Sequence, residues 1–145
     1  MPSPTHTRSQ YLSEEDINES NRKDSLIAEW MNRVARQFSM NGFVIERYFE
    51  TMWYLKPKAG FLSAPKPHVV NVEMNRTKDG GSEYFGGAKY YLMVGFRVEN
   101  KSPDDETIME LCKGLSDATG LPIWCNPSGR ELFHGYDRPA YYRKY

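Results

Sequence analysis

The segment HVVNVEMNRTKDGGSEYFGGAKYYLMVGFRVE, residues 68–99, predicts two neighbouring β-strands joined by a glycine-bearing connection. In its first part, Val70, Val72 and Met74 alternate with polar residues, which is the period-two pattern of a strand with one buried face. In its last part, large apolar side chains again occupy every second position: Tyr90, Leu92, Val94, Phe96 and Val98. Glycine pairs at 80–81 and 86–87 separate the two runs, so the simplest structure is a hairpin.

A helix and a further strand region precede this hairpin. Ser13 and Asp16 have the spacing of a capping box, and a large apolar residue then recurs at every fourth position, at Leu26, Trp30, Val34 and Phe38. Asn41-Gly42 predicts a left-handed helix stop. From residue 43 to residue 55 the apolar period changes to two, which predicts one long strand or two short ones bent near Glu50.

A second helix and two short strands follow the hairpin. Ser102 is the expected N-cap and Pro103 the first helical residue. Gly120 is the expected end of this helix, and its buried stripe consists of Ile108, Leu111, Cys112 and Leu115. Residues 123–125 and 131–134 flank an Asn-Pro-Ser-Gly turn sequence, which predicts a second hairpin.

These elements predict an α+β fold: a single domain with an antiparallel sheet of about five strands and two helices packed on one face, in the order α-β-β-β-α-β-β. We expect residues 1–12 to be a flexible leader and residues 13–145 to be the domain, with an aromatic-basic tail at 136–145. The sheet face away from the helices is the expected ligand or partner face, and it would carry Tyr48, Asn71, Glu73, Asn75, Tyr91, Met93 and Arg97.

Composition narrows the classes of protein. The chain has 145 residues, with 19 basic and 19 acidic side chains, so it lacks the net positive charge with which many proteins bind duplex DNA. Two cysteines are too few for a disulfide scaffold or a tetrahedral zinc site. Because the first residues lack the apolar core of a signal peptide and no run approaches a membrane span, we expect a cytoplasmic protein that does not bind membranes.

The glycine-rich connection has two interpretations. It contains neither G-x-x-x-x-G-K-[ST] nor G-x-G-x-x-G, and it precedes a strand, so it is not a nucleotide-hydrolysing P-loop. A plain hairpin loop is the first interpretation. The second is a lid in which Tyr84 and Phe85 stack on a planar ligand while Lys78 or Lys89 meets a phosphate.

Glu99-Asn100-Lys101 raises a metal-dependent alternative. An α-β-β-β-α-β order with E-x-K at a strand end resembles the core of nucleases of the restriction-endonuclease type, and Glu73 would then be the second acid. That resemblance implies Mg²⁺-dependent phosphodiester hydrolysis. A solvated strand end is the competing interpretation of the same residues.

The sequence carries no recognisable catalytic set, so no residue is assigned a catalytic role and neither a cofactor nor a metal is expected. Arginine pairs with phosphate and tyrosine stacks on planar rings. These preferences predict a ligand-binding set of Arg47, Tyr84, Phe85, Lys89, Tyr91, Arg97, Arg130 and Arg138.

We therefore expect a non-enzymatic binding protein that sequesters or recognises a nucleotide-like phosphorylated ligand or a short nucleic acid, acting as an inhibitor. A protein-interaction or inhibitor module that uses the aromatic sheet face is the alternative, and the magnesium-dependent nuclease is the second alternative. Three tyrosines in the last five residues also predict a homo-oligomer, because aromatic side chains are enriched at interfaces. The same tail has a second interpretation, in which it folds back on its own sheet.

Overall fold

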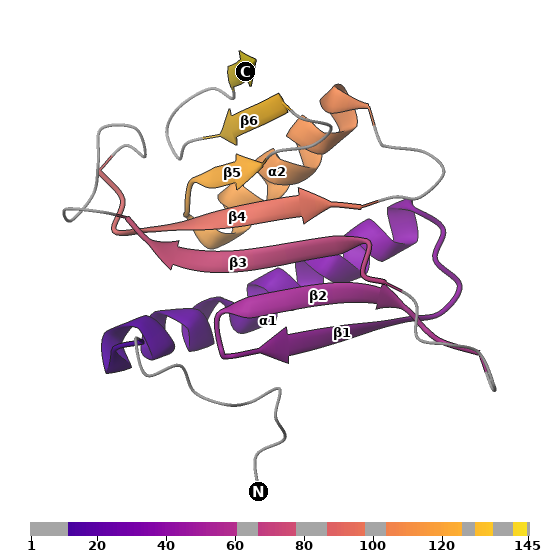
Figure 1. The fold of residues 1–145 in the computed structure, drawn as a ribbon, viewed down its shortest axis with the longest axis horizontal. Helices are drawn as coiled ribbons and strands as arrows, with labels where there is room; N and C mark the ends of the chain where they lie inside the picture. The colour runs from indigo at the N-terminus through magenta and orange to yellow at the C-terminus, as the bar shows by residue number, and fades with distance from the viewer. Residues whose placement is uncertain are drawn as a thin grey trace, which may run out of the picture.

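The fold is one seven-stranded sheet with two helices on one face (Figure 1). The computed structural model describes residues 12–60, 67–77, 87–97, 104–125, 130–134 and 141–144, and for the last two ranges it describes the backbone alone. The elements, in chain order, are α1 (Glu14–Gln37), β1 (Phe43–Tyr48), β2 (Met52–Pro57), β3 (Val70–Arg76), β4 (Tyr90–Phe96), α2 (Asp105–Thr119), β5 (Ile123–Cys125), β6 (Arg130–His134) and β7 (Tyr141–Lys144).

The strands lie in the sheet in the same order as in the chain. Every neighbouring pair is antiparallel except β4 and β5, which run parallel because α2 crosses over between them. The predicted α+β class, the single domain and the mostly antiparallel sheet are thereby confirmed. The sheet has more strands than the five expected, because residues 43–57 form two strands around a tight turn and β7 pairs with β6.

The helix ends test the capping predictions. The box between Ser13 and Asp16 is present, with the Asp16 amide donating to Ser13 Oγ at 3.1 Å. The predicted stop at Asn41-Gly42 is wrong: α1 ends at Gln37, and the left-handed residue after it is Ser39, with φ 54°.

The second helix also begins later than predicted. Its N-cap is Asp104, whose Oδ1 accepts from the Thr107 amide at 2.7 Å, whereas the predicted cap, Ser102, lies outside the described residues. A charged carboxylate at this position both caps the chain and interacts favourably with the helix dipole. The end at Gly120, left-handed with φ 73°, is confirmed.

Both helices pack on the same sheet face. The core residues of the strands alternate with polar ones, as Val72, Val94 and Ile123 do on β3, β4 and β5. The cross-strand register pairs Val72 with Val94, and it pairs Ile123 with another core residue of β4, Leu92. Trp30 and Met31 of α1 and Leu115 of α2 belong to the same buried cluster. Trp30 also joins the helices, because its Nε1 donates to the Leu111 carbonyl at 2.9 Å.

Among the described elements, no helix lies on the opposite face of the sheet (Figure 1). None of the described helices is both long enough and apolar enough to cross a membrane.

Candidate ligand-binding face

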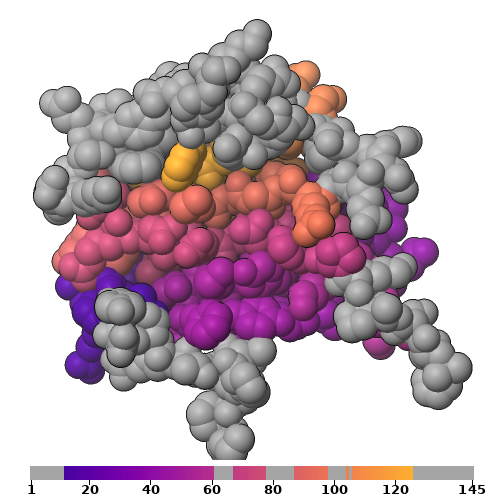
Figure 2. Space-filling model, viewed as in Figure 1, coloured from indigo at the N-terminus to yellow at the C-terminus, as the bar shows by residue number. Residues whose placement is uncertain are grey.

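The sheet face away from the helices, called the open face below, carries a row of side chains that follows the cross-strand register. The row runs from Tyr48 on β1 through Met52, Glu73 and Met93 to Trp124 on β5, each directly paired with the next. All five side chains are half-buried. Figure 2 shows this face over β1 to β4, and Figure 1 shows from the same viewpoint that both helices lie behind the sheet. The row is apolar except for one carboxylate at its centre.

The turn between β1 and β2 is strained and is held from the helix side. Phe49 and Glu50 both have positive φ, 50° and 66°, without being glycine, which costs about 1–2 kcal/mol per residue. The Glu50 carbonyl accepts hydrogen bonds from Arg47 Nε, at 2.9 Å, and from the Ser20 hydroxyl of α1. This anchoring holds Phe49 outward, where its side chain is 40% exposed.

An open pocket of about 350 Å³ lies beside that turn. It is lined by Tyr48, Phe49, Tyr54, Lys56 and His68. The rings meet edge to face, with 5.1 Å between the centroids of Tyr48 and Tyr54 and 4.8 Å between those of Tyr54 and His68. The volume falls in the usual range for small-molecule sites, and aromatic walls with few polar groups are typical of them.

Positive charge gathers at the same pocket. Lys56 Nζ lies 3.2 Å from Glu46 Oε1 and 3.3 Å from the Tyr48 hydroxyl. Burial lowers the pKa of His68, and the nearby charges of Arg97 and Lys56 lower it further. These effects favour the neutral form of the His68 ring, with Lys56 and Arg97 as the nearby cations.

Glu73, at the centre of the row, has no hydrogen bond or ion pair with any residue that the structure describes. Burial alone raises its pKa above the ordinary value. Its charge in turn contributes, after burial, to raising the pKa of the Tyr54 and Tyr91 hydroxyls, so both phenols lie close to it. The carboxylate of Glu73 is half-buried beside aromatic rings and thioethers, and no cation pairs with it among the described residues, so its oxygens are left to solvent or to an external donor.

Two buried donors also lack hydrogen-bond partners within the described part of the chain, the amide nitrogen of Asn75 and the indole nitrogen of Trp124. Asn75 follows Glu73 by two residues and so lies on the same face of β3. A native protein leaves few buried polar atoms unsatisfied. Both side chains lie on the same sheet face as Glu73.

The structure places two of the predicted binding residues on the open face. Tyr91 lies on β4 with its ring centroid 6.5 Å from that of Trp124. Arg97, just after β4, is exposed and close enough to affect the charge of His68. These two residues therefore flank the pocket and the central carboxylate.

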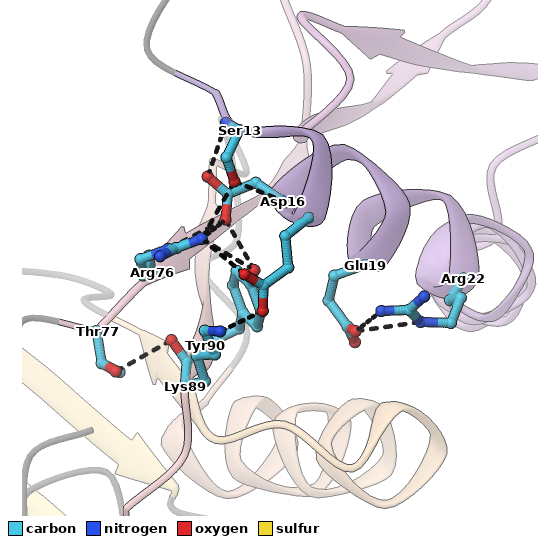
Figure 3. A network of polar contacts seen from close by, with 9 residues as sticks. Ser13, Asp16, Glu19, Arg22, Arg76, Thr77, Lys89 and Tyr90 are labelled. Carbon is cyan, nitrogen blue, oxygen red and sulfur yellow. Dashed lines mark hydrogen bonds and ion pairs between the residues drawn. The ribbon is translucent and has the colours of Figure 1, made fainter. Parts of the chain in front are cut away.

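Arg47 and Lys89 lie elsewhere, in contacts with α1. The guanidinium of Arg47 donates to Ser20 and Asn21, both at 2.8 Å, and lies over the Trp53 ring on the helix side. Lys89 pairs with Glu15 in the network at the start of α1 (Figure 3). The structure does not bring these two residues together with Tyr91 and Arg97.

In the same network, Asp16 accepts from Arg76 Nε at 3.1 Å and from the Tyr90 hydroxyl at 2.7 Å (Figure 3). Burial opposes ionisation of Asp16, but these bonds and those with Ser13 outweigh it and lower its pKa. Burial and the hydrogen bond to Asp16 raise the pKa of Tyr90 to about 12. The cluster is internally satisfied and anchors α1 to β3 and β4.

The remaining predicted site residues are not described in atomic detail. Tyr84, Phe85 and Arg138 lie outside the described residues, and Arg130 is described only as part of the β6 backbone. The lid hypothesis therefore stays a prediction. Glu99 and Lys101 of the nuclease hypothesis also lie outside the described residues, and the described residues contain no cluster of three metal-ligating side chains.

Sequence reasoning missed Tyr54, Lys56 and His68 as pocket residues. Alternation from residue 43 onwards already places Tyr54 and Lys56 on the same face as Tyr48, so a signal existed. His68 directly follows a proline-containing segment. Nothing in the local sequence indicates that its ring packs against Tyr54 of β2.

Comparison with known proteins identifies no relative. The chain matches no protein-family model, and searches of the curated proteins and of the solved structures find no match. The function is therefore argued from the geometry of the open face.

Proposed function

We propose that this protein is a non-enzymatic binding protein that holds a nucleotide-like phosphorylated ligand, or one unit of a short single strand, on its open face. The observation that carries the proposal is the pocket in which three rings in edge-to-face contact, Tyr48, Tyr54 and His68, lie beside the cationic side chain of Lys56. A second cation, Arg97, is near enough for its charge to act on His68. The ligand would be sequestered without being turned over.

Each half of the pocket supports one half of such a ligand. Tyrosine and histidine rings give a nucleobase a flat surface on which to stack, which is worth about 1–3 kcal/mol per base in single-strand binders. Lys56 and Arg97 supply donors and positive charge for a phosphate. Lys56 already pairs with Glu46, and a doubly charged phosphate would compete with that single carboxylate.

The first experiment measures binding of a panel of linear and cyclic nucleotides by thermal shift and calorimetry. We expect Tyr54→Ala to weaken binding by about tenfold, because a stacking surface is lost. Tyr54→Phe keeps the ring and should retain most of the affinity. Wild-type protein that binds no member of the panel would overturn the proposal.

A charge variant separates the phosphate contact from stacking. Lys56→Ala should weaken nucleotide binding by about tenfold and leave the binding of the uncharged nucleoside unchanged. Lys58→Ala is the matched control, because Lys58 is an exposed lysine two residues further on and does not line the pocket. Equal effects of the two variants would contradict a phosphate contact at Lys56.

A second candidate function is a protein-interaction module that docks through the same face. The half-buried row of Tyr48, Met52, Met93 and Trp124 favours it, because aromatic residues and methionine are enriched at interfaces. Native mass spectrometry of the purified protein distinguishes the two candidates, since it reports the oligomeric state and any retained small molecule together.

A further inference from the structure

We propose that Glu73 makes the open face selective for guanine, with the base edge at Glu73 and the phosphate toward Lys56 and Arg97. This inference rests on the proposed nucleotide-binding function and adds the identity of the base. It starts from the position of Glu73, which is paired across strands with Met52 and Met93 and lies on the same face of β3 as Asn71 and Asn75, each two residues away.

The acceptor pattern of Glu73 selects among the bases. An ionised carboxylate has two acceptor oxygens and no donor. Guanine presents two adjacent donors, the ring N1–H and the 2-amino group, which fit both oxygens at once. Adenine turned the same way presents the lone pair of its ring N1 beside its amino group, so one carboxylate oxygen would be repelled. Cytosine has only its amino group to offer.

A hydrogen-bond donor on the same sheet face as Glu73, the side-chain amide of Asn75, fits a third polar atom of guanine. The amide nitrogen of Asn75 is buried and has no hydrogen-bond partner within the described part of the chain. The carbonyl O6 of guanine lies next to N1–H and is an acceptor. Because this nitrogen is shielded from solvent in the free protein, the Asn75 side chain must turn outward to reach O6. In doing so it would satisfy a donor that now has no partner.

The charge layout of the face fits a molecule with its anion at one end. Lys56 lies four residues along β2 from Met52, the cross-strand partner of Glu73, a separation of about 13 Å between backbones at the rise of a strand. The long Lys56 side chain shortens that gap, and Arg97 lies at the same end, beside His68. A simple organic cation would satisfy Glu73 but would meet two positive charges in the adjoining pocket. A nucleotide places its phosphate there instead.

The test compares guanosine, inosine and adenosine 5′-monophosphates on wild-type protein and on Glu73→Gln by calorimetry. Inosine differs from guanosine only by lacking the 2-amino group. We expect wild-type protein to bind the guanosine nucleotide about tenfold more tightly than the inosine nucleotide, and adenosine more weakly still. Glutamine has nearly the shape of glutamate but replaces one acceptor by a donor, so Glu73→Gln should reduce these preferences to about twofold or less.

Glu110→Gln, the same change on an exposed glutamate of α2, is the control and should keep the wild-type preferences. Nucleotide binding without preference for guanine, or a preference that Glu73→Gln leaves intact, would overturn the role of Glu73 and leave the proposed function standing. Absence of binding by all three nucleotides would overturn both. The wild-type comparison of guanosine with inosine decides the inference even if the variant does not fold.

Discussion

Two carboxylates with tyrosine neighbours, Asp16 and Glu73, have opposite surroundings. The Asp16 carboxylate accepts hydrogen bonds from Arg76, from Tyr90 and from the backbone amide of its helix cap, Ser13, and its pKa is lowered. Glu73 lies near two tyrosines but has no bond to any described residue, and its pKa is raised. The same kind of group therefore stabilises the fold at one place and carries an unmatched charge at the other.

The difference distinguishes structural polar groups from available ones. A cluster whose donors and acceptors satisfy one another leaves little for a ligand to gain, whereas an acceptor held half-buried without a partner is already partly desolvated. An external donor that reaches Glu73 gains a hydrogen bond at a small further desolvation cost. The contrast can be tested through stability as well as through binding.

The largest effect is expected from Asp16→Ala. The change removes the acceptor of the buried Tyr90 hydroxyl and one half of the capping box, and we expect it to lower the free energy of unfolding by about 2–3 kcal/mol at pH 7. Urea unfolding measures the loss. Asp117→Ala, at an exposed aspartate of α2, is the control and should be neutral. A loss below about 0.5 kcal/mol would make the network equivalent to an ordinary surface ion pair.

The same variant has a defined pH dependence. Because the pKa of Asp16 is lowered in the folded protein, its ionised form stabilises the fold above the ordinary value of 3.8. That contribution is lost as the pH falls through the lowered pKa. The gap between wild type and Asp16→Ala should therefore narrow below pH 3.8 and stay constant above about pH 5.

The two carboxylates also show what the sequence reveals. The Ser13-x-x-Asp16 spacing is local, so it identified the cap. The bonds from Asp16 to Arg76 and Tyr90 join residues 60 and 74 positions apart, and no local pattern encodes such contacts. Strand alternation placed Glu73 on the open face, because the period of two holds wherever one face is buried.

Prediction of the site was weaker than prediction of the fold, for a physical reason. Side-chain type alone predicts that an arginine binds phosphate, but its strand position decides on which face of the sheet the side chain makes its hydrogen bonds. Arg47 occupies an odd-numbered position of β1, like Phe43 and Ile45, and so faces the helices. The alternative of two strands bent near Glu50 is confirmed, but the left-handed backbone of this turn has no sequence signal, because neither Phe49 nor Glu50 is a glycine or an asparagine.

Substitution in the turn at Phe49 and Glu50 should give the next largest change in the free energy of unfolding. This turn joins the helix side of the sheet to the pocket. Glu50→Gly relieves a φ of 66° and removes a side-chain oxygen that is buried without a hydrogen-bond partner among the described residues. We expect the free energy of unfolding, measured with urea, to rise by about 0.5–1 kcal/mol. This gain is the backbone strain that is relieved, minus the additional conformational entropy that a glycine loses on folding. Glu50→Ala removes the same oxygen but keeps the strain, so it should gain less. Equal gains would assign the whole effect to the buried oxygen.

The smallest and most discriminating effect is expected from Glu73→Gln. If Glu73 has no partner, replacing its carboxylate by a neutral amide removes a desolvation cost, and the protein should become more stable at pH 7 by about 0.5 kcal/mol. The gain is small because a half-exposed carboxylate keeps part of its hydration. Glu110→Gln, at an exposed position, should change nothing.

The pH dependence of this gain has the opposite sign to that of Asp16. With a folded pKa above the ordinary 4.5, Glu73 destabilises the fold when ionised, and wild-type stability recovers as the pH falls through the raised pKa toward 4.5. The extra stability of Glu73→Gln over the wild type should therefore vanish at acid pH. The extra stability of the wild type over Asp16→Ala also decreases there. If Glu73→Gln instead destabilised the protein at pH 7, the carboxylate would have a partner within the chain. The open face would then be a satisfied surface like the Asp16 network, and Glu73 would not be available to a base.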